Sequence, residues 1–180
     1  MNTRHQPVFE DLRSWSREVL DLPNPHLSGL KACPYAESAW KGKRVDVWVG
    51  EGPVDLKAAI RDFDPKSFDM AIWVNFNLSR VDLWDRWVQI WNKENFSTDI
   101  YLMLFHPDFP PSEESEAFLT DNDWESDLDE DYMMVFIQPL STLNKASLAL
   151  EEIGYYNHFA DHLYETLVLD RRRLSYGNGS

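Results

Sequence analysis

The most reactive side chains of this sequence occur in two short motifs. His106-Pro107-Asp108 follows an apolar run, and Cys33 opens the tetrapeptide Cys-Pro-Tyr-Ala. An imidazole and a carboxylate at the end of a strand suit general acid–base catalysis or the binding of a divalent metal, whereas a thiolate suits nucleophilic attack. The sequence therefore predicts His106, Asp108 and Cys33 as catalytic residues, and His106 and Asp108 as metal ligands.

Each of these residues also has a structural interpretation. His106 can close a strand by hydrogen bonding to the backbone while Asp108 caps a turn. Asn75 or Gln138, at the ends of other predicted strands, can complete a site with His106. Cys33, the single cysteine, can be a small buried apolar residue, because free cysteine is among the most buried residue types.

Hydrophobic patterns predict the elements that position these residues. The run Ile100 to Phe105 is typical of a strand buried on both faces. Other strands are predicted at residues 44–50, 70–76 and 133–138, and helices at residues 8–19, 33–42, 53–63, 79–91, 141–153 and 157–169. Cys33 then lies at a helix N-cap, where the helix dipole lowers the pKa of a thiol. Ser79 and Asp82 resemble a capping box, and Arg171 to Arg173 suit the dipole of the last helix.

The alternation of strands and helices predicts the α/β class. We expect a four-stranded, mostly parallel sheet with right-handed crossovers and flanking helices. The direction of the fourth strand stays open, and an antiparallel edge strand makes the class α+β. In a parallel sheet the strands end at one edge, so His106, Asp108 and Cys33 are expected to converge there.

Length and composition predict one domain over residues 1–180. The chain is 43% hydrophobic and contains one cysteine, which excludes an intrachain disulfide. It has no apolar run of the ~20 residues that a membrane span needs, and its N-terminal residues do not resemble a signal peptide. We therefore expect a cytoplasmic protein without membrane contact.

The net charge of −14 argues against nucleic acid as a partner, because such binding depends on lysine and arginine. Many acids lie in residues 112–132, which are predicted to form a mobile loop, usable as a lid or as a docking surface for a basic protein. Residues 176–180 are predicted to be a disordered tail. The eight tryptophans fill the core, line an apolar groove for a flat ligand, or form a self-association face of a homodimer.

Two motifs carry a resemblance to a known group of proteins. Cys33-Pro34-Tyr35-Ala36 and Phe105-His106-Pro107-Asp108-Phe109 resemble the Cys-Pro-Phe/Tyr-Ala and Phe-His-Pro-Asp-Tyr/Phe motifs of a family of small, uncharacterised bacterial proteins. The resemblance covers roughly the first two thirds of the chain and ends after Asp108, where acids replace an Asn- and Arg-containing segment. It implies that the two motifs belong together, and it supplies no reaction.

Two functional hypotheses follow. In the first, the protein is an enzyme for a small-molecule substrate, with His106, Asp108 and Cys33 at the carboxyl edge of the sheet. In the second, it is a non-catalytic, acidic interaction module that binds a basic protein.

Overall fold

A computed structural model describes residues 5–108 and 126–176 of the chain. Its α-helices are α1 (His5–Trp15), α2 (Ala36–Lys41), α3 (Pro53–Asp62), α4 (Val81–Glu94), α6 (Leu140–Glu152), α7 (Asp161–Tyr164) and α8 (Asp170–Tyr176). Two π-helical segments, η1 (Ser16–Leu20) and η5 (Glu165–Leu169), extend α1 and join α7 to α8. No helix within the described ranges is long and apolar enough to cross a membrane.

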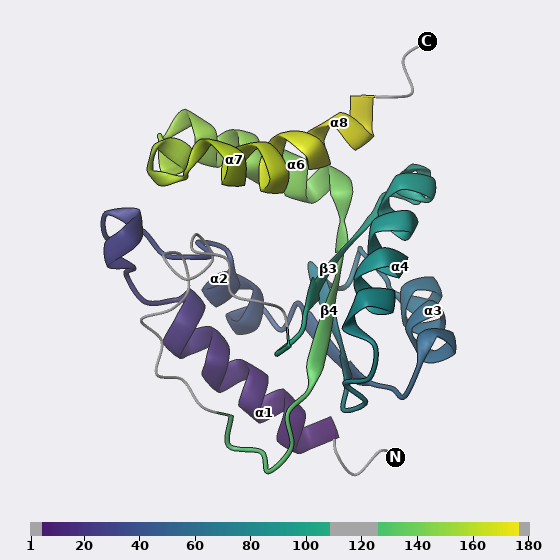
Figure 1. Cartoon of the computed structure of the whole chain (residues 1–180). Coiled ribbons are helices and arrows are strands. Elements are labelled where there is room, and N and C mark those ends of the chain that lie inside the picture. Colours follow the sequence, from purple (N-terminus) through teal and green to yellow (C-terminus); the bar gives the residue numbers. More distant parts are fainter. Residues whose placement is uncertain (1–4, 109–125, 177–180) are drawn as a thin grey trace.

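Four strands form one sheet in the order β1-β2-β4-β3 (Figure 1). The strands are β1 (Val45–Val49), β2 (Met70–Asn75), β3 (Ile100–Phe105) and β4 (Met133–Pro139). β1 pairs with β2 in parallel, whereas β4 lies antiparallel to both β2 and β3. The strands are therefore where the hydrophobic patterns predict them. The prediction that residues 100–105 are buried on both faces is wrong, because β3 is an edge strand in which only Ile100 and Leu102 are buried.

The predicted mostly parallel pairing is wrong, because two of the three strand pairs are antiparallel. The first three strands do run in one direction, but only β1 and β2 form the expected parallel pair. β4 arrives after a long connection, however, and inserts between β2 and β3 with the opposite direction. The sheet is therefore mixed, and β4 is a central strand instead of an edge strand.

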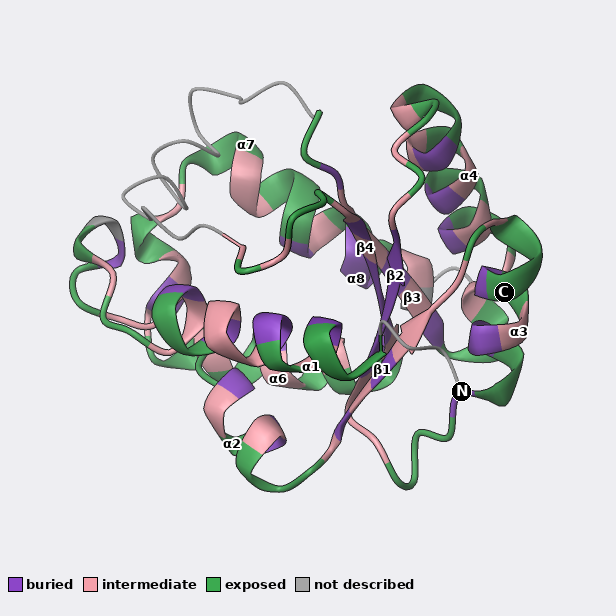
Figure 2. Ribbon diagram, turned by 90° about the horizontal axis from the view of Figure 1, so that it is seen from below, coloured by how far each residue is buried: buried purple, intermediate pink, exposed green. Residues whose placement is uncertain are grey.

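Helices cover both faces of the sheet. Leu56 of α3 and Val88 of α4 pack against Trp73 and Val135 on one face. Val8 and Leu12 of α1, together with Ala39 of α2, pack on the other. In Figure 2, α1, α3 and α4 each carry buried segments, and the strands between them are largely buried. The two apolar layers fix the positions of the strand ends that carry candidate site residues.

Helix α4 matches its predicted buried face but not its predicted start. Trp84 and Val88 are buried, as helical spacing predicts. The N-cap is Arg80, which adopts a left-handed conformation with φ of 63°, and no side chain caps the helix there. The Ser79–Asp82 capping box is therefore not formed, because the helix starts one residue later than such a box requires.

The C-terminal helices lie beyond the end of the sheet at which β4 ends (Figure 1). Arg171 and Arg172 of α8 are buried, although they were predicted to lie at a helix end as dipole partners. Arg172 donates hydrogen bonds to Ser147 Oγ at 2.6 and 3.0 Å and to Glu151 Oε2 at 2.8 Å, both on α6. A polar seam therefore joins α6 to α8.

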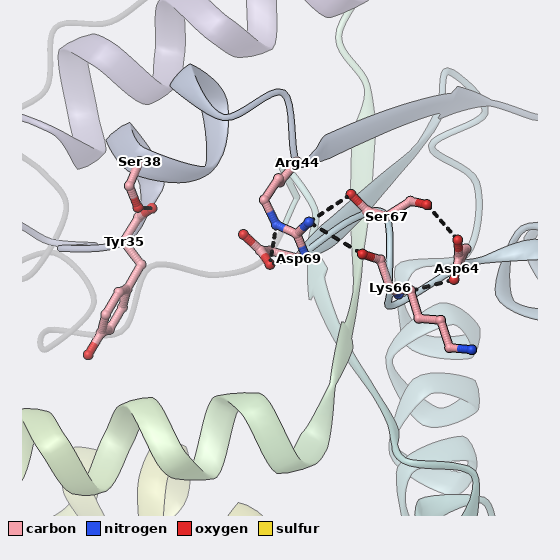
Figure 3. A network of polar contacts seen from close by, with 7 residues as sticks. All are labelled: Tyr35, Ser38, Arg44, Asp64, Lys66, Ser67 and Asp69. Carbon is pink, nitrogen blue, oxygen red and sulfur yellow. Dashed lines mark hydrogen bonds and ion pairs between the residues drawn. The ribbon is translucent and has the colours of Figure 1, made fainter.

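Arg44, immediately before β1, holds the turn that leads into β2 (Figure 3). Its Nε donates to Asp69 Oδ1 at 2.8 Å, and a terminal nitrogen donates to the carbonyl of Ser67 at 3.2 Å. The backbone N–H of Asp69 returns a bond to the carbonyl of Arg44 at 2.8 Å. These contacts fix the start of the parallel β1–β2 pair.

Candidate functional site

His106 lies at the carboxyl edge of β1, β2 and β3, as predicted. Met133 pairs with Asn75 of β2, and Met134 pairs with Phe105 of β3. Extending this register by one residue puts Asn75 and His106 on either side of Met133. Both polar residues are buried, with 2% and 7% of their surface exposed. His106 therefore lies at the same edge as Asn75, the candidate partner from another strand end, but β4 separates the two residues.

Gln138, the other proposed partner, lies at the opposite edge. It pairs with Tyr101 near the start of β3, because β4 runs antiparallel. The direction of β4 thus removes Gln138 from any site that contains His106.

The hydrogen bond of His106 favours a structural role. Its Nδ1 accepts the backbone N–H of Asp108 at 3.1 Å. While Nδ1 accepts this bond, the proton of the ring lies on Nε2. This bond closes the turn after β3 through the backbone of Asp108, while the Asp108 side chain is exposed. The catalytic and metal-binding roles of His106 and Asp108 stay predictions.

The part of the chain that the structure describes contains no set of ligands for the predicted metal site. Within residues 5–108 and 126–176, no three side chains of His, Cys, Asp or Glu are grouped so that they could hold a metal ion. His106 and Asp108 therefore lack a third protein ligand among these residues.

Cys33 lies in a different environment. Helix α2 begins at Ala36 with Tyr35 as its N-cap, so Cys33 precedes the N-cap that it was predicted to occupy. Its backbone N–H donates to the carbonyl of Leu20 at 3.3 Å. Burial raises the pKa of the Cys33 thiol, and backbone N–H groups of Tyr35 and Ala36 only partly oppose this effect. The thiol is therefore protonated at neutral pH.

The neighbours of Cys33 do not include the other predicted site residues. The hydroxyl of Tyr155 donates to the carbonyls of Lys31 and Ala32, at 3.0 and 2.9 Å, beside the thiol. Among the described residues no contact joins Cys33 to His106 or Asp108. The contacts of the described residues thus do not support the predicted convergence of Cys33 with His106 and Asp108.

A buried carboxylate that sequence reasoning missed anchors the end of the acidic segment. Asp11 of α1 is 3% exposed. It accepts hydrogen bonds from Ser126 Oγ at 2.8 Å, the N–H of Asp127 at 2.8 Å and the hydroxyl of Tyr132 at 2.6 Å. Residues 126–132 are therefore held against α1, although the segment 112–132 was predicted to be mobile. Residues 112–125 of that prediction, and 177–180 of the predicted tail, lie outside the described residues.

A surface hollow of about 360 Å³ lies between α1 with its extension η1 and α2. We call it the α1–α2 hollow. Its lining consists of Arg13, Arg17, Asp21, Leu22, Lys31, Glu37, Trp40 and Lys41. Arg13 and Arg17 are four residues apart, so they project from one side of the helix. The sequence therefore already shows that Arg13 and Arg17 can act together. The residues of α2 that complete the hollow are brought to them only by the fold.

Two ion pairs organise one wall of the α1–α2 hollow. Lys31 Nζ lies 2.6 Å from Glu37 Oε2, and Lys41 pairs with the other oxygen of Glu37. Hydrogen bonds from these two lysines lower the pKa of Glu37 to about 2. Glu37 is therefore ionised at neutral pH, and its charge is shared by two cations.

The remaining charged groups of the α1–α2 hollow are less well paired. In the described part of the chain no carboxylate forms an ion pair with Arg13 or Arg17. Burial raises the pKa of Asp21, and the nearby Lys31 opposes the shift. Asp21 Oδ1 is buried and has no hydrogen-bond partner among these residues. With four cations and two carboxylates, the lining is net positive in a chain of net charge −14.

A second hollow, of about 400 Å³, adjoins the first. Arg13 and Arg17 also line it, together with Glu10, Asp127 and Leu128. The two arginines therefore form a ridge between the hollows and are reachable from both sides.

Comparison of the chain with models of protein families, with curated proteins and with solved structures gave no match. The resemblance of the two short motifs to an uncharacterised bacterial family accordingly stays a prediction.

Proposed function

We propose that the protein binds a small organic anion in the α1–α2 hollow. The observation that carries this proposal is the pair of guanidinium groups, Arg13 and Arg17, that face the hollow without a carboxylate partner in the described residues. Two cations four residues apart on a helix repel one another, and a bound anion removes that cost.

The chemistry of the lining indicates a phosphate or carboxylate ligand. Guanidinium groups form paired hydrogen bonds with both anions, and Lys31 and Lys41 lie on the facing wall. The volume of the hollow is within the range of small-molecule sites. The anion therefore fits between the arginine ridge and the two lysines.

Trp40 and Asp21 indicate what the part of the ligand beyond the anionic group contains. Trp40 is half-buried and contacts Phe9 edge to face, with ring centroids 5.4 Å apart. This contact fixes the indole as a flat apolar surface for a ring. The free oxygen of Asp21 is suited to accept an N–H group from the ligand. A ring that carries a phosphate or carboxylate satisfies most of these groups.

The test uses phenyl phosphate as the probe, with inorganic phosphate and phenol as its separate charged and apolar parts. Isothermal titration calorimetry is expected to show tighter binding of phenyl phosphate than of either part. Arg13→Gln and Arg17→Gln should each weaken binding about tenfold or more, because each removes charge-assisted hydrogen bonds. Arg86→Gln, an exposed arginine on α4 across the sheet, is the matched control.

Three results would overturn the proposal. Phenyl phosphate could fail to bind at millimolar concentration, Arg86→Gln could weaken binding as much as the two test variants, or binding could be unchanged in Arg13→Gln and Arg17→Gln. Any of these outcomes places anion binding outside the hollow or removes it altogether.

The two sequence-based hypotheses stay predictions beside this proposal. The enzyme hypothesis depends on convergence of Cys33 with His106, which the contacts of the described residues do not support. The basic-partner hypothesis depends on the acidic segment, most of which lies outside the described residues.

A further inference from the structure

Two neighbouring arginines of α8 are both buried, but only one of them has a counter-charge. Arg171 is 9% exposed and Arg172 is 7% exposed. Arg172 pairs with Glu151 Oε2 at 2.8 Å, and the carboxylate next to Arg171, that of Asp170, pairs with Arg173 at 2.7 Å. No carboxylate of residues 5–108 and 126–176 forms an ion pair with Arg171. The charge of this buried guanidinium is therefore not balanced by the residues that the structure describes.

The groups that hold the Arg171 guanidinium are neutral. Its Nε donates to Asn144 Oδ1 of α6 at 3.2 Å. The guanidinium also hydrogen bonds with the hydroxyl of Tyr156, and Tyr101 lies nearby. Burial lowers the pKa of Arg171, and the two phenols oppose this shift. Because a buried cation without an anion is costly, a bound anion would stabilise this arrangement.

The hydrogen-bond donors around Arg171 come from three elements. Arg171 belongs to α8, Tyr156 to the 3-10 helix η4 (Tyr155–His158) and Tyr101 to β3. A guanidinium forms two parallel hydrogen bonds with an oxyanion, and phenol hydroxyls can donate to its other oxygens. Phosphate is tetrahedral and accepts donors from several directions, whereas a carboxylate is planar. Donors from three elements therefore favour phosphate.

We propose that Arg171 and Tyr156, with Tyr101 beside them, form a binding site for inorganic phosphate that is separate from the α1–α2 hollow. Only a small part of Arg171 is exposed, so the site favours a compact ion over a phosphate ester with a bulky group. Helices α6 and α8 lie side by side beyond the end of the sheet (Figure 1). A bound phosphate therefore ties these C-terminal helices to the start of β3.

The test compares phosphate with NaCl at equal ionic strength. The parent protein is the double variant R13Q/R17Q, so that the arginines of the α1–α2 hollow do not contribute. About 10 mM phosphate should raise its melting temperature by a few degrees more than NaCl does, because a ligand of the folded state stabilises it. Arg171→Met should abolish this increase. Without phosphate the same variant should melt above the parent, since it removes a buried, unbalanced charge.

Two further variants separate binding from folding. Tyr156→Phe keeps the ring and should weaken phosphate binding, measured by calorimetry, about threefold or more, because one hydroxyl is lost. Arg172→Met is the matched control, since this buried arginine already has a carboxylate partner in Glu151. It should lower the melting temperature and retain the increase that phosphate causes.

Several results would overturn the proposal. Phosphate could stabilise the parent no more than NaCl does, Arg171→Met could melt below the parent or keep the phosphate-dependent increase, or Tyr156→Phe could bind phosphate like the parent. Tighter binding of acetate or phenyl phosphate than of inorganic phosphate would also contradict it. Because the parent lacks Arg13 and Arg17, none of these results bears on anion binding in the α1–α2 hollow.

Discussion

At the residue scale, Cys33 illustrates how an environment changes the chemistry expected from a residue type. A cysteine near the start of a helix is a candidate nucleophile when the N–H groups of the helix stabilise its thiolate. In the folded protein two such N–H groups do reach the thiol, but burial outweighs them and raises the pKa of Cys33. Its backbone N–H donates to the carbonyl of Leu20, and the carbonyls of Lys31 and Ala32 just before it accept the hydroxyl of Tyr155, so the loop is joined to η1 and to the C-terminal part of the chain.

This environment predicts that the Cys33 thiol reacts slowly with thiol reagents. Cys33 in the native protein should react with Ellman's reagent about tenfold or more slowly than an exposed thiol, because both the thiolate fraction and access are reduced. The reference is Leu148→Cys in a Cys33→Ser background, at a position that is exposed. Equal reaction rates of the two proteins at pH 8 would show that Cys33 is accessible and ionised, which would restore the nucleophile hypothesis.

At the element scale, Asn92 of α4 protects the open edge of the sheet. β3 is an edge strand, whose outward N–H and C=O groups need partners. The Asn92 amide nitrogen donates to the carbonyl of Leu102 at 2.9 Å, and its oxygen accepts the N–H of Leu102 at 2.8 Å. One buried side chain thus replaces a neighbouring strand at this residue.

Removing that amide should destabilise the fold. Asn92→Leu keeps a side chain of similar size but leaves two backbone groups of Leu102 unpaired, at a cost of about 1–3 kcal/mol for each group. Urea unfolding measures the loss. Gln89→Leu on the same helix removes an exposed amide and should change the free energy of unfolding by about 0.5 kcal/mol or less. If the two variants unfold at the same urea concentration, the N–H and C=O groups of Leu102 have other hydrogen-bond partners.

At the scale of the whole molecule, the net charge of −14 opposes compaction. Ion pairs at the surface offset little of this repulsion, because pairs such as Arg61–Asp62 and Arg80–Asp82 are largely exposed. Added salt should therefore stabilise the fold, because it screens more repulsion between like charges than attraction within ion pairs.

Raising NaCl from about 0.02 M to about 0.5 M should increase the melting temperature by a few degrees, since salt screens like charges at these distances. Asp129→Asn combined with Asp131→Asn removes two exposed carboxylates and should show a smaller increase. A melting temperature that falls with salt in both proteins would mean that attractive ion pairs dominate. Sodium chloride is suited to this test because it contains no organic anion that could occupy the α1–α2 hollow.

The sequence by itself determined the positions of the strands and the buried face of α4. Alternation in Val45–Val49 and the apolar run Ile100–Phe105 mark strands, and the spacing of Trp84 and Val88 marks the face of α4 that packs on the sheet. These patterns are local, since each depends on residues within one or two turns or along one strand.

Only the tertiary structure decided the order of the strands, the direction of β4 and the composition of the sites. The insertion of β4 between β2 and β3 sent Gln138 to the far edge and put Met133 between Asn75 and His106. The α1–α2 hollow joins Arg13 to Lys41 across two helices, and Asn92 meets Leu102 across a turn. Such pairings depend on which distant segment buries which surface, and the periodicity of one segment contains no information about its partner.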